Sequence, residues 1–485
     1  MSLISINPVN GQVIATHPAW NHEQLEAALT QAGNVQPAWR TLGFPARADI
    51  LSQVATLLRE RIEPLARLIS AEMGKILPEA RAELEKCALI CDYYAVHAEP
   101  FLEEELIPTD AGKSYVRYEP LGIVLGVMPW NFPFWQAVRF VAPALMSGNG
   151  VALKHAPSVQ GCAQALETLL RDAGVPEGVF TNLPIEVDLV SVAIAHPAVQ
   201  AVAMTGSERT GRIVAGLAGS QLKKTVVELG GSDAFVVLAD ADLELAVSRA
   251  VQSRFNNAGQ ACIAAKRFIL VPQIAEAFVE ALKAKVSALK VGDPTEHGTQ
   301  IGPLARRDLR DELHRQVQAT LAAGAKAVLG CHPLEGPGFF YAPSILDHVP
   351  AGCLARQEEL FGPVAVCIRA RDEADALAIA NETRFGLGAS IWSRDYARAE
   401  QMTGHLQAGL TFVNGVVKSD PRLPFGGIKA SGFGRELSFH GIREFCQAKT
   451  VWVRDGWTPG QERRRGDRRR GDRRITDDQV PKNSV

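Results

Sequence analysis

Apolar residues recur at helical spacing through the first hundred residues of the chain. They do so in ARADILSQVATLLRERIEPLARLIS, residues 46–70, and again in PEARAELEKCALICDYYAVHAEPFL, residues 78–102. Apolar positions three and four apart predict helices with one buried face. Cys87 and Cys91 stand four positions apart in the second stretch, so a helix places both thiols on one face, where they suit packing.

The pattern changes beyond residue 120. Short apolar runs bounded by glycine, proline or polar residues alternate there with helical stretches such as GCAQALETLLRDAG, residues 161–174. Buried strands that alternate with helices indicate a parallel sheet covered on both faces. A second pattern of this kind extends from about residue 232 to 430, so the chain is predicted to form two α/β domains. The first runs interpreted as strands are 122–128, 150–154, 199–204, 225–229 and 234–238.

Two segments depart from this α/β pattern. SYVRYEPLG, residues 114–122, alternates apolar and polar residues and predicts an exposed ribbon with one covered face. ERRRGDRRRGDRRITDDQVPKNSV, residues 462–485, has almost no apolar residue, so we expect it to be disordered. A basic run can contact nucleic acid, but the interspersed acidic residues and the near-neutral body favour a solvated tail.

The composition is that of an ordinary globular protein. The chain has 485 residues, 47% of them apolar and 21% charged, with a formal net charge of −2. This length suffices for two or three domains, and the charge gives no indication of nucleic-acid or membrane binding. No run approaches the ~20 apolar residues of a membrane helix, and the first twenty residues show no secretory signal.

The cysteines indicate a reducing compartment. None forms a C-x-x-C pair, and no Cys/His cluster has the spacing of a zinc site. We therefore expect a cytoplasmic protein with no bound metal. The eight cysteines are Cys87, Cys91, Cys162, Cys262, Cys331, Cys353, Cys367 and Cys446.

MTGSERTG, residues 204–211, combines a strand end with a helix start. The apolar run ends at Met204, Gly206 permits a tight turn, and Ser207 can cap the helix that follows. The backbone amides of such a helix start form a site for phosphate. The stretch lacks the G-x-G-x-x-G spacing of the usual dinucleotide fingerprint, and glycine–serine after a strand is also ordinary turn chemistry.

VVELGGSDAFVVL, residues 226–238, ends an apolar run on Glu228, directly before two glycines. A carboxylate there lies near the carboxyl edge of a sheet, where ligands bind in such folds. Apolar surroundings would raise its pKa toward that of a general base. The alternative is a strand-end glutamate in solvent.

Two further side chains are candidates for carbonyl chemistry. In PWNFP, residues 129–133, prolines and aromatics hold Asn131 in a rigid turn, and a fixed amide donor suits an oxyanion site. The alternative is a stiff turn without a chemical role. In FNNAGQACIAAKR, residues 255–267, Cys262 is either a nucleophile or a small apolar residue of a buried segment, the usual role of a free cysteine.

Together these stretches resemble the aldehyde dehydrogenase superfamily, and the resemblance runs from residue 6 to residue 452. It implies an α/β fold with a Rossmann-type cofactor domain, an α/β catalytic domain and a small oligomerisation ribbon. The motifs that carry it are PWNFP, TGS, ELGG, AGQAC, EELFGPV (358–364), NETRFGL (381–387) and PFGGIKASGFGRE (424–436). The implied segments are NAD(P) binding at 1–100 and 121–231, catalysis at 232–435, the ribbon and C-terminal segment at 101–120 and 436–456, and the arginine-rich tail at 457–485.

The resemblance also implies a mechanism. The Cys262 thiolate would attack the aldehyde carbon to form a thiohemiacetal, while the Asn131 amide and the backbone N–H of Cys262 stabilise the oxyanion. Hydride transfer to a nicotinamide would leave a thioester, and Glu228 would activate the water that hydrolyses it to the acid. The intact set argues against a non-catalytic relative. Glu228 argues against a coenzyme A-acylating one, because such members often lack this glutamate.

The cofactor residues are carried over by position. Lys154 would lie near the adenine ribose and Ser207 at the pyrophosphate, while the nicotinamide riboside would contact Glu359 and Phe361. Many NAD-preferring members have a glutamate three residues after the lysine, where this chain has Pro157. NAD is therefore the expected cofactor and NADP the alternative. The full implied set is Pro129, Trp130, Lys154, Gly206, Ser207, Leu229, Gly230, Glu359 and Phe361.

Arg139 suggests the substrate class. It stands eight residues after Asn131, where succinate-semialdehyde dehydrogenases carry an arginine for the substrate carboxylate, and a guanidinium pairs well with a carboxylate. Asn256 stands where better-studied members have a second arginine, so Arg422 is our candidate for the second contact. The alternative for Arg139 is an ion pair at the surface or between domains.

We therefore expect oxidation of succinic semialdehyde to succinate, with another aliphatic or aromatic aldehyde as the alternative substrate. The resemblance implies a homodimer or homotetramer, because members are commonly dimers or dimers of dimers. The ribbon near 101–120 and the segment 440–455 would build the intersubunit sheet by edge pairing. We expect no membrane or nucleic-acid partner.

Overall fold

The computed structural model describes residues 2–454, and it confirms the predicted α/β class. The chain forms two compact units. Within the described residues, the larger consists of residues 2–102 and 119–446, and the smaller consists of residues 103–118 and 447–454. The predicted tail at 457–485 lies outside the described residues. The division of the chain into cofactor, catalytic and oligomerisation segments stays a prediction.

The first sheet of the larger unit has six strands in the order β17-β9-β8-β5-β6-β7. Its neighbours are parallel except β17, which is antiparallel to β9. Four strands confirm the buried runs predicted from the sequence, whereas β7 is too short to show in the pattern. The strands are β5 (Ile123–Met128), β6 (Gly150–His155), β7 (Phe180–Asn182), β8 (Val199–Thr205), β9 (Lys224–Glu228) and β17 (Gly432–Phe433).

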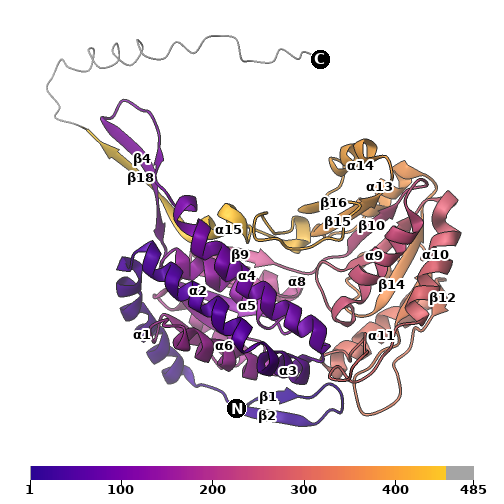
Figure 1. The fold of residues 1–485 in the computed structure, drawn as a ribbon, viewed down its shortest axis with the longest axis horizontal. Helices are drawn as coiled ribbons and strands as arrows, with labels where there is room; N and C mark the ends of the chain where they lie inside the picture. The colour runs from indigo at the N-terminus through magenta and orange to yellow at the C-terminus, as the bar shows by residue number, and fades with distance from the viewer. Residues whose placement is uncertain (1, 455–485) are drawn as a thin grey trace. The chain divides into compact units, whose positions relative to one another are not determined.

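Helices cover both faces of this sheet (Figure 1). The chain passes from β5 through β6 to β7 in one direction and returns through β8 to β9 in the other, so right-handed crossovers place α5 and α6 on one face and α7 and α8 on the opposite face. The helices α2, α3 and α4 pack against α5 or α6, and α1 packs against α7. Their bounds are α1 (His22–Thr41), α2 (Phe44–Glu60), α3 (Ile62–Met73), α4 (Leu77–Phe101), α5 (Trp135–Met146), α6 (Gln160–Asp172), α7 (Val190–Ala195) and α8 (Glu208–Ser220).

The helical stretch predicted at 46–70 forms two helices. α2 ends and α3 begins around Arg61, whose backbone leaves the helical region at φ −100° and ψ 17°. Pro64 explains the break, because its ring nitrogen carries no hydrogen to continue the helical hydrogen bonds and the ring would clash with the preceding turn. The stretch at 78–102 forms the single helix α4, and Cys87 and Cys91 are both buried in it.

β17 returns from a distant part of the sequence to the edge of the first sheet. Gly432 pairs with Glu228, and Phe433 pairs with Val227. A Cβ at position 432 would lie 1.9 Å from the carbonyl oxygen of Val227, and the φ of this residue is +113°, so glycine is required there. The motif at 424–436 therefore closes the sheet beside Glu228.

The second sheet of the larger unit has seven strands in the order β12-β13-β14-β11-β10-β15-β16, all parallel to their neighbours except β12, which is antiparallel to β13. Its core stacks Trp392 on Phe235, with ring centroids 4.7 Å apart. The strands are β10 (Asp233–Val237), β11 (Ala265–Leu270), β12 (Lys326–Leu329), β13 (Ser344–Asp347), β14 (Val364–Arg369), β15 (Gly388–Trp392) and β16 (Leu410–Val413). The helices that come after β10 in the sequence are α9 (Leu243–Phe255), α10 (Pro272–Ser287), α11 (Arg307–Ala322), α12 (Leu354–Gln357), α13 (Glu373–Asn381), α14 (Tyr396–Thr403) and α15 (Ser438–Glu444).

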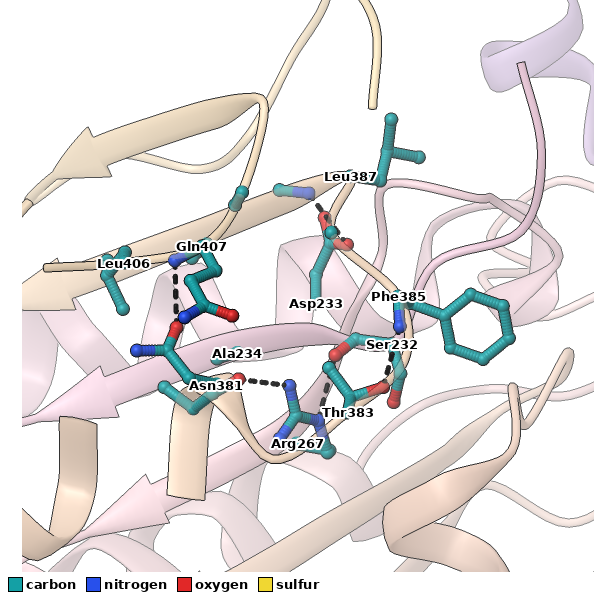
Figure 2. Close-up of a pocket in the computed structure, with 15 residues that line it drawn as sticks. Ser232, Asp233, Ala234, Arg267, Asn381, Thr383, Phe385, Leu387, Leu406 and Gln407 are labelled. Atoms are coloured by element: carbon teal, nitrogen blue, oxygen red, sulfur yellow. Dashed lines mark hydrogen bonds between the residues drawn. The ribbon is translucent and has the colours of Figure 1, made fainter. Parts of the chain in front are cut away.

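A buried polar network joins this sheet to the segment that enters β15 (Figure 2). Arg267 on β11 donates to the carbonyl of Ser232 and to two carbonyls of α13. The Asp233 carboxylate accepts from the backbone N–H of Gly388 at 3.0 Å, and burial raises its pKa to about 6. The space between these groups is about 10 Å³, which is room for one water molecule. The network is therefore structural.

The smaller unit contains a three-stranded sheet in the order β18-β4-β3. β4 confirms the strand predicted at 114–122, and β3 is antiparallel to it. A separate antiparallel pair, β1 with β2, lies in the larger unit. Across residues 2–454, no helix is long and apolar enough to cross a membrane. These strands are β1 (Ser2–Ile6), β2 (Val13–Pro18), β3 (Glu105–Leu106), β4 (Lys113–Pro120) and β18 (Cys446–Val453).

Candidate active site

Four of the predicted segments lie at the carboxyl ends of strands in the first sheet. Residues 129–131 follow β5, Lys154 lies near the end of β6, residues 206–207 follow β8, and Glu228 ends β9. The strand order reverses between β5 and β8, and open α/β sheets bind ligands at such a point. The topology thus gathers residues that are far apart in the sequence at one edge of the sheet.

Cys262 follows a short turn with strained backbone. Asn257 and Ala258 in this turn have φ angles of 53° and 51°, which residues with side chains rarely adopt. The Glu79 carboxylate on α4 accepts a hydrogen bond from the backbone N–H of Asn257 at 2.9 Å, and burial raises the pKa of Glu79 to about 7. α4 therefore supports the turn that carries the candidate nucleophile.

An amide network joins this turn to Asn131. The side-chain amide of Asn131 donates to the carbonyl of Gln260 at 3.0 Å, and that of Asn257 donates to the carbonyl of Asn131 at 2.8 Å. The Oε1 of Gln260 accepts from the backbone N–H of Ala305. Because Asn131 is only 4% exposed, its amide is held in one orientation, with a second N–H for another acceptor.

Cys262 is half-buried and lines a cavity of about 600 Å³. Burial raises the pKa of its thiol to about 11, and the positive charges of Arg139 and Lys266 oppose this rise. The Nζ of Lys266 also donates to the carbonyl of Cys262 at 2.6 Å. The other seven cysteines are buried, as expected for thiols that only pack.

Glu228 is buried, so the solvent-exposed alternative is wrong. It is 2% exposed, and neither carboxylate oxygen has a hydrogen-bond partner of good geometry within residues 2–454. Burial and the neighbouring Glu436 carboxylate raise its pKa well above the usual range, and Arg139 partly opposes the rise. A buried carboxylate with a raised pKa is suited to accept a proton from water.

α8 begins at the place where the sequence predicts a phosphate site. Ser207 is its N-cap, and the Ser207 hydroxyl accepts from the backbone N–H of Thr210 at 3.3 Å. Ser207 is exposed, which leaves the helix start accessible. A Cβ at Gly206 would lie 2.6 Å from Cε of Met204. Lys154 is buried near the end of β6, and burial lowers its pKa to about 8.

Glu359 reaches the end of β9. Its Oε1 accepts from the backbone N–H of Gly231 at 3.1 Å and lies 3.1 Å from Nζ of Lys266. A Cβ at Gly230 would lie 2.2 Å from Oε2 of Glu359, so the missing side chain at position 230 permits this close approach. The neighbouring Leu229 is buried against α8.

Trp130 and Phe361 meet edge to face, with ring centroids 5.8 Å apart. Trp130 is buried, whereas Pro129 and Phe361 are half-buried. The pair connects the segment after β5 with the segment 358–364. The structure thus brings together Trp130 and Phe361, and likewise Gly230 and Glu359, from the implied cofactor set.

Arg139 on α5 lines the cavity of Cys262 but already has a carboxylate partner. Its Nε lies 2.5 Å from Oε2 of Glu436, its Nη2 donates to the Thr205 hydroxyl at 3.2 Å, and its guanidinium lies over the ring of Phe425. Arg139 and Glu436 are both buried. The structure therefore contains an ion pair at Arg139, as the alternative interpretation predicted, and this pair is buried.

Arg422 is not among the residues that line the cavity of Cys262. Its side chain is 75% exposed and forms two hydrogen bonds with the Asp420 carboxylate. The structure does not bring Arg422 together with Arg139, and its role as the second carboxylate contact stays a hypothesis.

Sequence reasoning missed three charged residues of α4 that line the same cavity: Glu79, Glu83 and Lys86. The signal was present, because they stand at positions i, i+4 and i+7 and therefore share one helix face. Glu436 was also missed. It lies within the motif at 424–436, but nothing in that motif indicates that its carboxylate meets Arg139.

The chain is similar to named enzymes over most of its length. It is 47% identical over 453 residues to a probable succinate-semialdehyde dehydrogenase, NADP(+), of Synechocystis sp. This alignment covers 93% of the present chain and 100% of the relative. It is 46% identical over 449 residues to the succinate semialdehyde dehydrogenase NAD(P)+ Sad of Escherichia coli, covering 93% and 97%. The crystal structure of succinic semialdehyde dehydrogenase from Streptococcus pyogenes with NADP+ matches with a TM-score of 0.91 at 36% identity, covering 93% and 100%.

Residues 2–451 match the aldehyde dehydrogenase family as a whole. This range contains both sheets of the larger unit and all the site residues described above. The resemblance found in the sequence motifs is thereby confirmed, and the chain belongs to the aldehyde dehydrogenase family.

Proposed function

We propose that the protein oxidises succinic semialdehyde to succinate, with NAD or NADP as the hydride acceptor. The observation that carries this proposal is the cavity in which Cys262 lies near two cationic side chains, Lys86 and Arg139. Glu79 and Glu83 also line this cavity, but cationic donors such as Lys86 and Arg139 can bind an aldehyde that bears a carboxylate. The named relatives, at 46% and 47% identity, support the same substrate.

The reaction begins with Cys262 as the nucleophile. Its thiol is mostly protonated at neutral pH, since burial raises its pKa to about 11. The charges of Arg139 and Lys266 favour the thiolate, which is the reactive form. Attack on the aldehyde carbon forms a carbon–sulfur bond and places a negative charge on the former carbonyl oxygen. The second N–H of the Asn131 amide is held ready to donate to this oxygen.

The residues at the strand ends fit a dinucleotide. The open start of α8 offers backbone N–H groups to phosphate, Lys154 offers a buried cation, and the absent side chain of Gly230 lets Glu359 approach the strand end. These residues would hold a nicotinamide cofactor, which would supply a hydride acceptor for oxidation of the aldehyde carbon to the acid level. Pro157 places no carboxylate three positions after Lys154, so we propose that a 2′-phosphate is accepted.

Glu228 completes the cycle by activating water for hydrolysis of the thioester. Its carboxylate is buried, and its raised pKa makes it a stronger base than a glutamate in solvent. Removal of a proton from water by Glu228 forms the hydroxide equivalent that attacks the thioester carbon. The carbon–sulfur bond then breaks, succinate leaves, and the Cys262 sulfur is released for the next turnover.

The test compares kcat/KM for succinic semialdehyde with kcat/KM for butanal, following NADH or NADPH formation by the purified protein. A preference of roughly a hundredfold, ~2.7 kcal/mol of transition-state stabilisation, would support the proposal. Similar values for both substrates would overturn the substrate assignment and favour the alternative of a broad aliphatic or aromatic aldehyde dehydrogenase.

We further propose a cytoplasmic homodimer or homotetramer. The three-stranded sheet of the smaller unit supports assembly, because β3 and β18 form its edges and unpaired edges favour association. Light scattering of the full chain distinguishes the two states, and a monomer would contradict the proposal.

A further inference from the structure

The cavity of Cys262 is lined by four buried or half-buried charged groups outside the catalytic set: Glu79, Glu83, Lys86 and Arg139. Three of them have partners that neutralise or satisfy them. Glu83 forms an ion pair with Lys75 and accepts from two backbone N–H groups at the start of α5. Glu79 accepts from the turn before Cys262, and Arg139 is paired with Glu436.

Lys86 differs from these groups. Its Nζ donates to the Ser419 hydroxyl at 2.5 Å and lies 4.2 Å from the ring centroid of Trp135. No carboxylate in the described part of the chain lies within ion-pair distance of it. A poorly solvated ammonium without a counterion is costly. Lys418 also lines the cavity but is exposed, so Lys86 is the cavity cation with most to gain from an anionic ligand.

The surroundings of Lys86 support this interpretation. Its pKa is lowered to about 8, first by burial and then by the like charge of Arg139. The groups that interact with it are Glu83 and Cys87 on α4, Arg139 on α5, and Cys262. An incoming carboxylate would offset the free-energy cost of the poorly solvated ammonium. It would also offset the repulsion between Lys86 and Arg139.

We propose that the ammonium group of Lys86 binds the carboxylate of the substrate and determines selectivity for a semialdehyde acid. Ser419 then acts as a positioning residue, because its hydroxyl holds the ammonium against Trp135. Arg139 remains paired with Glu436. This inference rests on the proposed function and assigns its substrate selectivity to a residue of α4.

The test measures kcat/KM for succinic semialdehyde and for butanal in Lys86→Met, Lys86→Arg and the wild-type holoenzyme. Loss of a charge-assisted hydrogen bond predicts a fall of roughly tenfold to hundredfold for the acid in Lys86→Met. The fall for butanal should be much smaller, and Lys86→Arg should recover most of the loss. Lys285→Met is the matched control, because Lys285 also donates to a serine hydroxyl but lies exposed on α10.

A pH profile adds a readout that a structural role would not produce. The ratio of the two kcat/KM values cancels the titration of Cys262 and Glu228, which act on both substrates. In the wild type this ratio should fall as the pH rises through about 8, where Lys86 loses its charge, and in Lys86→Arg it should stay level.

Two results would overturn the inference while leaving the proposed function intact. One is an equal loss for both substrates in Lys86→Met. The other is an unchanged preference for the acid in Lys86→Met together with a loss of that preference in Arg422→Ala or Arg139→Met. If the wild type itself shows no preference for the acid over butanal, the proposed function fails first.

Discussion

The carboxylate of Glu79 accepts a hydrogen bond at 2.9 Å from the backbone N–H of Asn257, across 178 positions of sequence. The backbone of Asn257 lies in the left-handed region, and its side-chain amide donates hydrogen bonds to the carbonyls of Asn131 and Gln260. A carboxylate on α4 therefore helps to hold in place Asn131, the candidate oxyanion donor, and the segment leading to Cys262. Glu79 is a positioning residue, since it acts through Asn257.

Replacement of Glu79 by alanine should lower kcat more than it raises KM. The buried N–H of Asn257 would lose its acceptor, at a cost of ~1–3 kcal/mol, and Asn131 would lose its fixed orientation. We expect kcat to fall by roughly tenfold or more, while Glu79→Gln should retain activity because its amide oxygen can still accept. Steady-state kinetics of both variants provide the measurement. Glu63→Ala is the control, because Glu63 is an exposed carboxylate paired with Arg81, and a similar fall in that variant would contradict the assignment.

The same carboxyl group should make stability depend on pH. The pKa of Glu79 rises from 4.5 to about 7 on folding, so between these values the native state binds more protons than the unfolded state. The contribution of Glu79 to the free energy of unfolding is therefore complete below pH 4.5. It is lost as the pH rises through about 7. Glu79→Gln should resemble the wild type near pH 5 and exceed it near pH 8, by on the order of 1–3 kcal/mol. Urea unfolding at both pH values measures the difference, and parallel profiles would show that Glu79 does not titrate in this range.

Pattern and motif located several candidate residues at strand ends, which the fold places together, and the roles of these residues stay predictions. Glu228 and Ser207 were found from the sequence, since each follows an apolar run at a sheet edge. Cys262 was identified through its motif, because one cysteine among eight carries no signal of its own. The residues that were missed are charged side chains of helices and loops.

Glu79, Lys86 and Glu436 illustrate why those residues escaped. Charged residues on a helix usually face solvent, and α4 departs from this rule because its polar face lines the cavity of Cys262. Which residues meet there depends on the packing of α4 against α5 and on the return of the chain at β17. These contacts are long-range, so neither periodicity nor spacing along the chain reports them.

Glu228→Gln should separate the two halves of the reaction. The amide keeps the size of the side chain but cannot take a proton from water, so thioester formation should proceed and its hydrolysis should not. We expect a first-turnover burst of reduced cofactor followed by a steady state slowed by roughly a hundredfold to ten-thousandfold. Stopped-flow absorbance with enzyme in the micromolar range shows both phases. If the burst disappears together with the steady state, Glu228 acts before the thioester, for example by activating Cys262.

Gly230→Ala should impair cofactor binding without destabilising the fold. The new Cβ would lie 2.2 Å from Oε2 of Glu359, so the Glu359 side chain must move and give up its contacts with Gly231 and Lys266. A flexible side chain can move at little cost to folding, but the arrangement of side chains at the end of β9 changes. We expect KM for NAD or NADP to rise by roughly tenfold, with the melting temperature nearly unchanged.

Gly216→Ala is the control for that substitution. Gly216 lies in α8, and a Cβ there meets nothing within 4 Å. Alanine is the better helix former, so this variant should be stabilised by about 0.5–1 kcal/mol with KM for the cofactor unchanged. A rise in cofactor KM in both variants would show that the effect is not specific to the contact between position 230 and Glu359. A rise in Gly230→Ala alone would place it at the contact between position 230 and Glu359.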